Sequence, residues 1–124
     1  MAVQNYKQLT AWQKAMDLVV EVYKVTDCFP KQEVFGLTNQ MRRAAVSVPS
    51  NIAEGQGRGT RDTFRQFLLI ARGSLKELET QVILAKRLGF LPEGAEVHLF
   101  GSLAEMARII NGLRGKLVGA RDRC

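Results

Sequence analysis

Residues 64–85, FRQFLLIARGSLKELETQVILA, decide the fold of this chain, because their apolar side chains recur at alternating spacings of four and three. That spacing lines one side of an α-helix and is the a/d pattern of helices that pack against one another. Thr60 is a suitable N-cap residue, and Asp62 lies where the helix dipole favours a negative charge. Gly89 stands where helices commonly end in a left-handed residue. We therefore predict a helix over residues 60–88, whose stripe is formed by Phe64, Leu68, Ala71, Leu75, Leu78, Val82 and Ala85.

Three more helices are predicted from the same kind of spacing. The first covers about residues 9–27 and ends near Phe29, because a residue that precedes proline is disfavoured in a helix. The second covers about residues 34–56, and the fourth covers about residues 94–118, after the turn-forming stretch LPEGAE. The expected apolar stripes are Trp12, Met16, Val19 and Tyr23 in the first helix, widened by Ala15, Val20 and Val22, then Leu37, Met41, Ala44, Val48 and Ile52 in the second, and Phe100, Leu103, Ala107, Ile110, Leu113 and Leu117 in the fourth.

The chain has 124 residues, of which 46% are hydrophobic and 24% are charged, and this composition suits one globular domain with a real core. No stretch shows the sustained alternation of a half-buried strand. Short links make sequential helices antiparallel neighbours. We therefore predict an all-α fold, an up-and-down antiparallel four-helix bundle that forms a single domain over residues 1–124.

Pro49 lies inside the second apolar stripe, which continues in phase from Val48 to Ile52. A proline within a helix removes one hydrogen bond and clashes with the carbonyl four residues earlier, at a cost of about 3 kcal/mol. The short polar side chains of Ser47 and Asn51 can hydrogen-bond to nearby backbone groups. A kinked but continuous helix is favoured, and a break at Val48 followed by a new short helix is the alternative.

Three glycines follow in GQGRGT, which includes Gly55, Gly57 and Gly59. A phosphate-binding P-loop needs a Lys-Ser/Thr pair and a preceding strand, and the dinucleotide fingerprint also needs a strand and a third glycine where Thr60 stands. Both are absent from the sequence, so the stretch is interpreted as a turn between two helices. Free N–H groups at the start of the next helix, beside Arg58, are also suited to an anion.

The net charge of +6 is concentrated in two blocks of the sequence. Residues 42–76 carry seven basic and two acidic side chains, and residues 108–124 carry five basic and one acidic side chain. A concentrated basic field attracts polyanions such as nucleic acid, although a solvated surface is the alternative interpretation. The candidate nucleic-acid-binding residues are Arg42, Arg43, Arg58, Arg61, Arg65, Arg72 and Lys76.

The third helix carries more apolar residues than one bundle needs, since FLLIA is apolar on nearly all sides. In a four-helix bundle each helix keeps one face outward, and an exposed apolar stripe usually marks a contact with another molecule. The sequence predicts an oligomer interface formed by Phe67, Leu69, Ile70, Ile83 and Leu84, unless wide packing absorbs these residues within one bundle.

Several kinds of chemistry are not expected of this chain. His98 is the single histidine, and Glu77 and Glu79 point to different helix faces, so neither a multi-histidine metal site nor an acid/base pair is predicted. Cys28 and Cys124 are interpreted as free thiols in a reducing compartment. No apolar run approaches the ~20 residues of a membrane span, and no signal peptide is visible. A cytoplasmic protein without cofactor, metal or enzymatic activity is expected.

Two long stretches, FGLTNQMRRAAVSVPSNIAEGQGR (residues 35–58) and FRQFLLIARGSLKELETQVILAKRLGFL (residues 64–91), resemble a known bacterial family. That four-helix-bundle family is named for proteins encoded in intervening sequences of 23S ribosomal RNA genes. The pair VPSNIAEG and GSLKELETQ is a specific signature, and the first helix with Trp12 also fits. The resemblance implies a homopentameric ring with a central channel, and it brings no catalytic residues.

A related branch of that family comprises the accessory variability determinants of diversity-generating retroelements. These proteins are basic, bind nucleic acid and act with a reverse transcriptase, so the resemblance implies RNA or DNA, and a reverse transcriptase, as partners. The leading hypothesis is a non-enzymatic oligomeric bundle that binds nucleic acid, with RNA favoured, through basic helix faces. The alternative is a protein-interaction scaffold, such as an accessory subunit of a retroelement reverse transcriptase.

Overall fold

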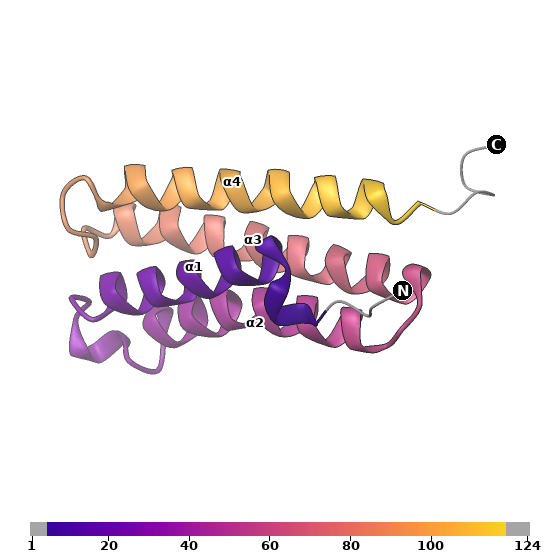
Figure 1. Cartoon of the computed structure of the whole chain (residues 1–124). Helices are drawn as coiled ribbons and strands as arrows, with labels where there is room; N and C mark the ends of the chain where they lie inside the picture. Colours follow the sequence, from indigo (N-terminus) through magenta and orange to yellow (C-terminus); the bar gives the residue numbers. More distant parts are fainter. Residues whose placement is uncertain (1–4, 119–124) are drawn as a thin grey trace.

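The protein folds into four α-helices, shown in Figure 1, in a computed structural model that describes residues 5–118. The helices are α1 (Thr10–Thr26), α2 (Leu37–Gly57), α3 (Arg61–Arg87) and α4 (Ala95–Lys116). Two 3-10 turns, η1 (Tyr6–Gln8) and η2 (Lys31–Glu33), precede α1 and α2. The all-helical fold is confirmed, and within the described residues there is no strand.

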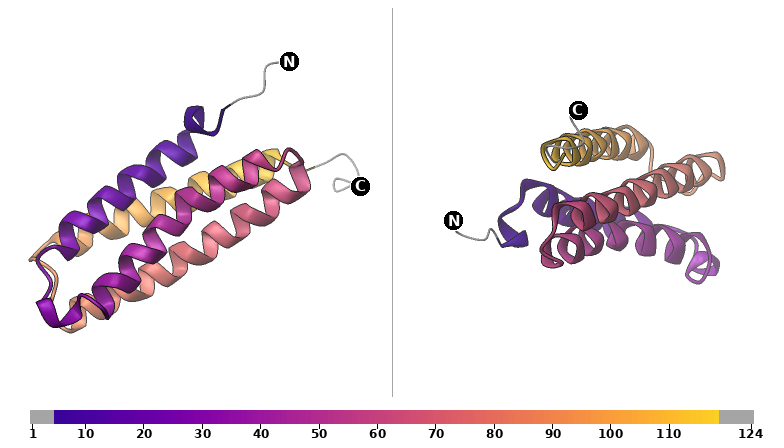
Figure 2. Two further views of the ribbon diagram at one scale, coloured as in Figure 1. Left: turned by 90° about the horizontal axis from the view of Figure 1, so that it is seen from below. Right: turned by 90° about the vertical axis from the view of Figure 1, so that its right-hand side faces the viewer.

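Each helix packs against its two neighbours around the bundle, so that α1 contacts α2 and α4, and α3 contacts α2 and α4. Within the described residues, no Cα atoms of the diagonal pairs α1–α3 and α2–α4 lie within 8 Å of one another. The views in Figures 1 and 2 show that successive helices run in opposite directions. The short links predicted from the sequence therefore produce an up-and-down bundle.

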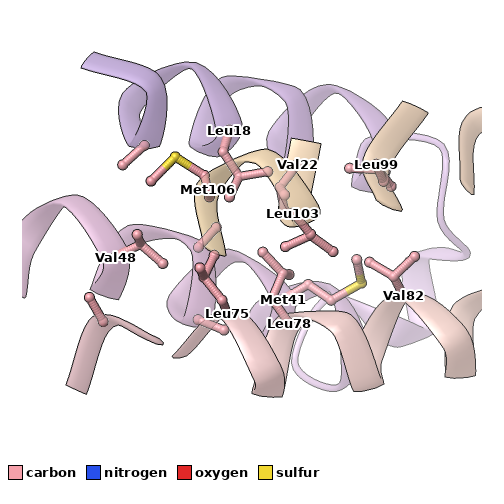
Figure 3. Packing of buried hydrophobic residues seen from close by; sticks show 14 of the residues in the cluster. Leu18, Val22, Met41, Val48, Leu75, Leu78, Val82, Leu99, Leu103 and Met106 are labelled. Carbon is pink, nitrogen blue, oxygen red and sulfur yellow. The ribbon is translucent and has the colours of Figure 1, made fainter. Parts of the chain in front are cut away.

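All seven a/d residues predicted for α3 are buried, so the stripe that decides the fold is confirmed. They meet apolar side chains from the other three helices in one continuous core, part of which is labelled in Figure 3. The largest fully buried side chains are Leu18, Val22, Met41, Val48, Ile52, Leu68, Leu78, Val82, Leu99, Met106 and Ile110.

The stripe predicted for α1 is confirmed only in part, since Ala15 and Val22 are buried and Trp12 and Val19 pack against the core. Met16 and Tyr23 are 40% and 43% exposed, whereas the buried stripe consists of Ala11, Ala15, Leu18, Val22 and Thr26. Both sets recur at spacings of four and three, so spacing alone could not choose between them. In α4 the core likewise takes Leu99 and Met106, while Phe100 and Ala107 are half-buried against it.

Helix α2 continues through Pro49 to Gly57, so the continuous helix is confirmed and the break at Val48 is wrong. Asn51 donates hydrogen bonds to the carbonyl oxygen of Ser47 at 2.8 Å and to its hydroxyl at 2.9 Å. The Ser47 hydroxyl also shares a hydrogen bond of 2.7 Å with the Ser74 hydroxyl of α3. These polar groups connect α2 to α3 just before the proline.

The glycines between α2 and α3 have separate structural roles. Gly55 is a buried helical residue, and a Cβ added to it would lie 2.5 Å from the Cβ of Phe67. Gly59 has a φ of 88°, which a glycine adopts without steric cost, and it reverses the chain. The Thr60 hydroxyl then accepts a hydrogen bond from the N–H of Thr63, which confirms Thr60 as the N-cap of α3.

Two other helix ends follow from local chemistry. Helix α2 begins at Leu37, later than the expected residue 34, because residues before it form η2 and the non-helical Gly36. The Glu33 carboxylate accepts a hydrogen bond from the N–H of Leu37 and so caps the helix. Helix α3 is followed by Gly89 with a φ of 76°, which confirms the predicted left-handed residue.

Candidate nucleic-acid interface

Residues from both basic blocks of the sequence lie at one end of the bundle. Because α3 and α4 are antiparallel, the beginning of α3 lies beside the end of α4, at the right of Figure 1 and toward the viewer in the right panel of Figure 2. The turn from α2 to α3 lies at the same end. We call this region the basic end, and its residues are Arg58, Arg61, Arg65, Arg72, Arg108, Arg114 and Lys116.

The seam between α3 and α4 brings three arginines together. Arg65 and Arg72 are seven residues apart on α3 and are half-buried, as is Arg114 of α4. Arg72 donates a hydrogen bond of 3.1 Å to the side-chain oxygen of Asn111, one helical turn before Arg114. Burial lowers the pKa of the Arg114 guanidinium, and the nearby charges of Arg72 and Arg65 lower this pKa further.

Arg58 and Arg61 lie at the turn into α3. The Arg58 guanidinium is 2.6 Å from the Glu54 carboxylate, in an exposed pair on α2, and it also lies over the ring of Phe67 at 5.3 Å. Arg61 is exposed at the first position of α3. An exposed ion pair in water contributes little to stability, so the carboxylate does not hold Arg58 firmly away from a phosphate.

Arg42 and Arg43 lie far from the basic end. Arg58 follows Arg42 by sixteen positions, which is about 24 Å along a helix axis. Arg42 donates to the Thr26 hydroxyl at 2.8 Å and to the Tyr23 carbonyl at 3.3 Å, and it stacks on the Tyr23 ring at 4.5 Å. It therefore joins α1 to α2, whereas Arg43 is exposed.

Lys76, the last member of the predicted set, is 73% exposed in the middle of α3, where its ammonium lies 3.7 Å from the Glu79 carboxylate. The structure thus places four of the seven predicted basic residues at the basic end. Three basic residues of α4 and Asn111 lie near them, and none of these four was among the predicted residues. Their sequence signal was the second basic block in residues 108–124.

The apolar stripe of α3 is exposed in the single chain. Leu69, Ile70, Ile83 and Leu84 are between 41% and 51% exposed, and Lys76 and Glu77 lie between the two apolar pairs along the helix. Phe67, in contrast, packs within the chain against Gly55. We call the four exposed residues the α3 stripe.

A groove of about 650 Å³ lies between α1 and α4. Within it the Glu21 carboxylate accepts a hydrogen bond of 2.9 Å from the Ser102 hydroxyl and also contacts the exposed His98 ring.

Within the described residues, no three His, Cys, Asp or Glu side chains are grouped as metal ligands would be. No helix within residues 5–118 is both long and apolar enough to span a bilayer. Cys124 lies outside the described residues.

Comparisons with known proteins agree with this fold. The profile of a family described as 23S rRNA-intervening sequence protein matches residues 7–112. The chain therefore belongs to the 23S rRNA-intervening sequence protein family. Among proteins with curated descriptions, none matches the chain.

A similar fold occurs in a crystal structure of a protein with unknown function from the S23 ribosomal protein family of Bacteroides thetaiotaomicron VPI-5482. The TM-score is 0.75 at 20% sequence identity, and the match covers 85% of this chain and 98% of that one. At this identity the likeness concerns the fold alone.

Proposed function

We propose that this protein is a non-catalytic bundle that binds nucleic acid, with RNA favoured, through the basic end. The observation that carries the proposal is that basic residues from two separate blocks of the sequence lie at one end of the bundle. Guanidinium groups bind phosphate oxygens well, and neutralised phosphates release condensed counterions. Binding through such contacts is sensitive to salt and nearly independent of base sequence.

The test is the fluorescence anisotropy of a labelled single-stranded 20-mer, as RNA and as DNA, at 50 and 200 mM salt. Five phosphate contacts on a single strand would lower the affinity about 100-fold over this range. Arg61→Gln is expected to reduce the salt slope by about 0.7, and Arg87→Gln, at the other end of α3, serves as the matched control. Failure to bind either nucleic acid at 50 mM salt would contradict the proposal.

The assembly proposed for this function is a homo-oligomer joined through the α3 stripe. Four large apolar side chains that are nearly half exposed on one helix face are typical of a protein contact. The family resemblance implies that the copies close into a five-membered ring. A ring would bring several basic ends together, and several linked weak sites bind a long polyanion more tightly than one site.

A second candidate function is a protein-interaction scaffold, in which a polymerase such as a reverse transcriptase is the partner. The α3 stripe supports it, because that surface suits a protein partner as well as a second copy. Arg61→Glu distinguishes the two functions. Nucleic-acid binding would be lost, whereas capture of the purified partner would be retained if the scaffold role is separate.

A further inference from the structure

Two arginines of the α3–α4 seam, Arg72 and Arg114, lie near one side-chain amide. Arg72 lies beside Asn111, to which it donates a hydrogen bond, and Arg114 follows Asn111 by three residues, on the next turn of α4. Within residues 5–118, neither Arg72 nor Arg114 forms an ion pair. The Arg114 Nε atom is buried and has no hydrogen-bond partner there. Such a group is expected to cost stability unless a ligand satisfies it.

The positive charges of neighbouring arginines also act on Arg114. Burial and the charges of Arg72 and Arg65 lower the pKa of Arg114, which is the direction that nearby like charges produce. Like charges that stay together at a half-buried seam are offset most directly by an anion. Asn111 accepts from Arg72 with its amide oxygen, which leaves its amide N–H groups as donors.

We propose that Arg72, Asn111 and Arg114 form a discrete site for one phosphate group on the α3–α4 seam. Two guanidinium groups and an amide supply directed donors that match the oxygens of a tetrahedral phosphate. This site would be part of the proposed nucleic-acid surface. The assignment of its ligand as the phosphodiester backbone rests on that proposed function. The same donors would also hold free phosphate, so the test includes both sources.

The first arm measures the thermal unfolding midpoint with inorganic phosphate, at constant ionic strength and protein concentration. Phosphate at ten times its dissociation constant is expected to raise the midpoint by roughly 4 to 7 °C in the natural protein. Arg72→Gln and Arg114→Gln should lose this shift, and Arg87→Gln, which removes an exposed charge at the other end of α3, should retain it. An equal shift in Arg114→Gln, or no shift of the natural protein at 50 mM phosphate, would overturn the site.

The second arm measures binding of the labelled RNA to the same variants. At least a five-fold loss of affinity in Arg114→Gln but not in Arg87→Gln supports the backbone phosphodiester as the ligand. Unchanged RNA affinity in Arg114→Gln, with the phosphate shift lost, supports the site and assigns it to a free phosphate. If the natural protein binds RNA but phosphate does not raise its unfolding midpoint, the result contradicts the phosphate site and supports the proposed function.

Discussion

Arg72 of α3 donates a hydrogen bond of 3.1 Å to the side-chain oxygen of Asn111 of α4, across 39 positions of the sequence. This contact lies where two basic stretches, far apart in the chain, become neighbours. It positions one guanidinium beside the turn of α4 that carries Arg114. The seam thereby combines directed hydrogen-bond donors with concentrated positive charge, which is the chemistry that phosphate recognition requires.

Substitution of Gly55 by alanine should destabilise the protein by about 1–2 kcal/mol. The new methyl group would lie 2.5 Å from the Cβ of Phe67 and 3.1 Å from a ring carbon of Phe64, and the overpacking outweighs the helix propensity that alanine gains. Urea denaturation measures the change in the free energy of unfolding.

Gly101→Ala is the matched control for that substitution. Gly101 is an exposed residue within α4, and no atom lies within 4 Å of the added Cβ, so this variant should gain about 0.5–1 kcal/mol. Equal effects of the two substitutions would show that α2 and α3 do not approach closely at Gly55.

Loss of the N-cap of α3 should be measurable by the same method. Thr60→Ala removes the hydroxyl that accepts from the N–H of Thr63 and should cost about 0.5–2 kcal/mol of unfolding free energy. Thr60→Ser keeps the oxygen and should stay close to the natural protein. A cost for serine as large as that for alanine would argue against the cap.

The stability of the protein should depend on Glu96 in acid. The pKa of the Glu96 carboxyl is lowered first by a hydrogen bond from its own backbone N–H and then by one from Lys86, whose Nζ lies 3.1 Å away. A carboxyl with a lowered folded-state pKa stabilises the protein above its unfolded-state pKa. That contribution is lost as the pH falls through the folded-state pKa.

Glu96→Gln provides the measurement for this pH dependence. The natural protein should be the more stable of the two at pH 7, and the difference should shrink as the pH falls below the ordinary range of a glutamate. Urea denaturation of both proteins between pH 7 and pH 3 measures it. A difference that stays constant over this range would contradict the role of ionised Glu96.

The α3 stripe should control the mass of the native assembly. Leu69→Gln combined with Ile83→Gln removes two apolar side chains that are 41% and 42% exposed, so the single bundle should keep its fold while the oligomer dissociates. Native mass spectrometry reports the number of copies, and circular dichroism reports the helices. A monomeric natural protein at micromolar concentration would contradict the prediction that the α3 stripe is an oligomer interface.

The candidate site was only partly predictable from the sequence. Clustering of basic residues in 42–76 pointed to an anion-binding surface, but linear proximity does not decide which residues share a surface. Arg42 and Arg58 lie about 24 Å apart along α2, and Arg42 serves the contact between α1 and α2. Arg114 joins Arg72 because antiparallel packing aligns the beginning of α3 with the end of α4.

The sequence by itself determined four helices, their approximate ends, the Thr60 cap and the buried stripe of α3, because spacing and capping are local properties of the chain. Only the tertiary structure decided which stripe of α1 is buried. The alternatives have the same periodicity, and the core takes Ala11 beside the expected Ala15, whereas Met16 and Tyr23 stay exposed. Small side chains let the neighbouring helices approach closely, and that depends on the shape of the partners rather than on spacing.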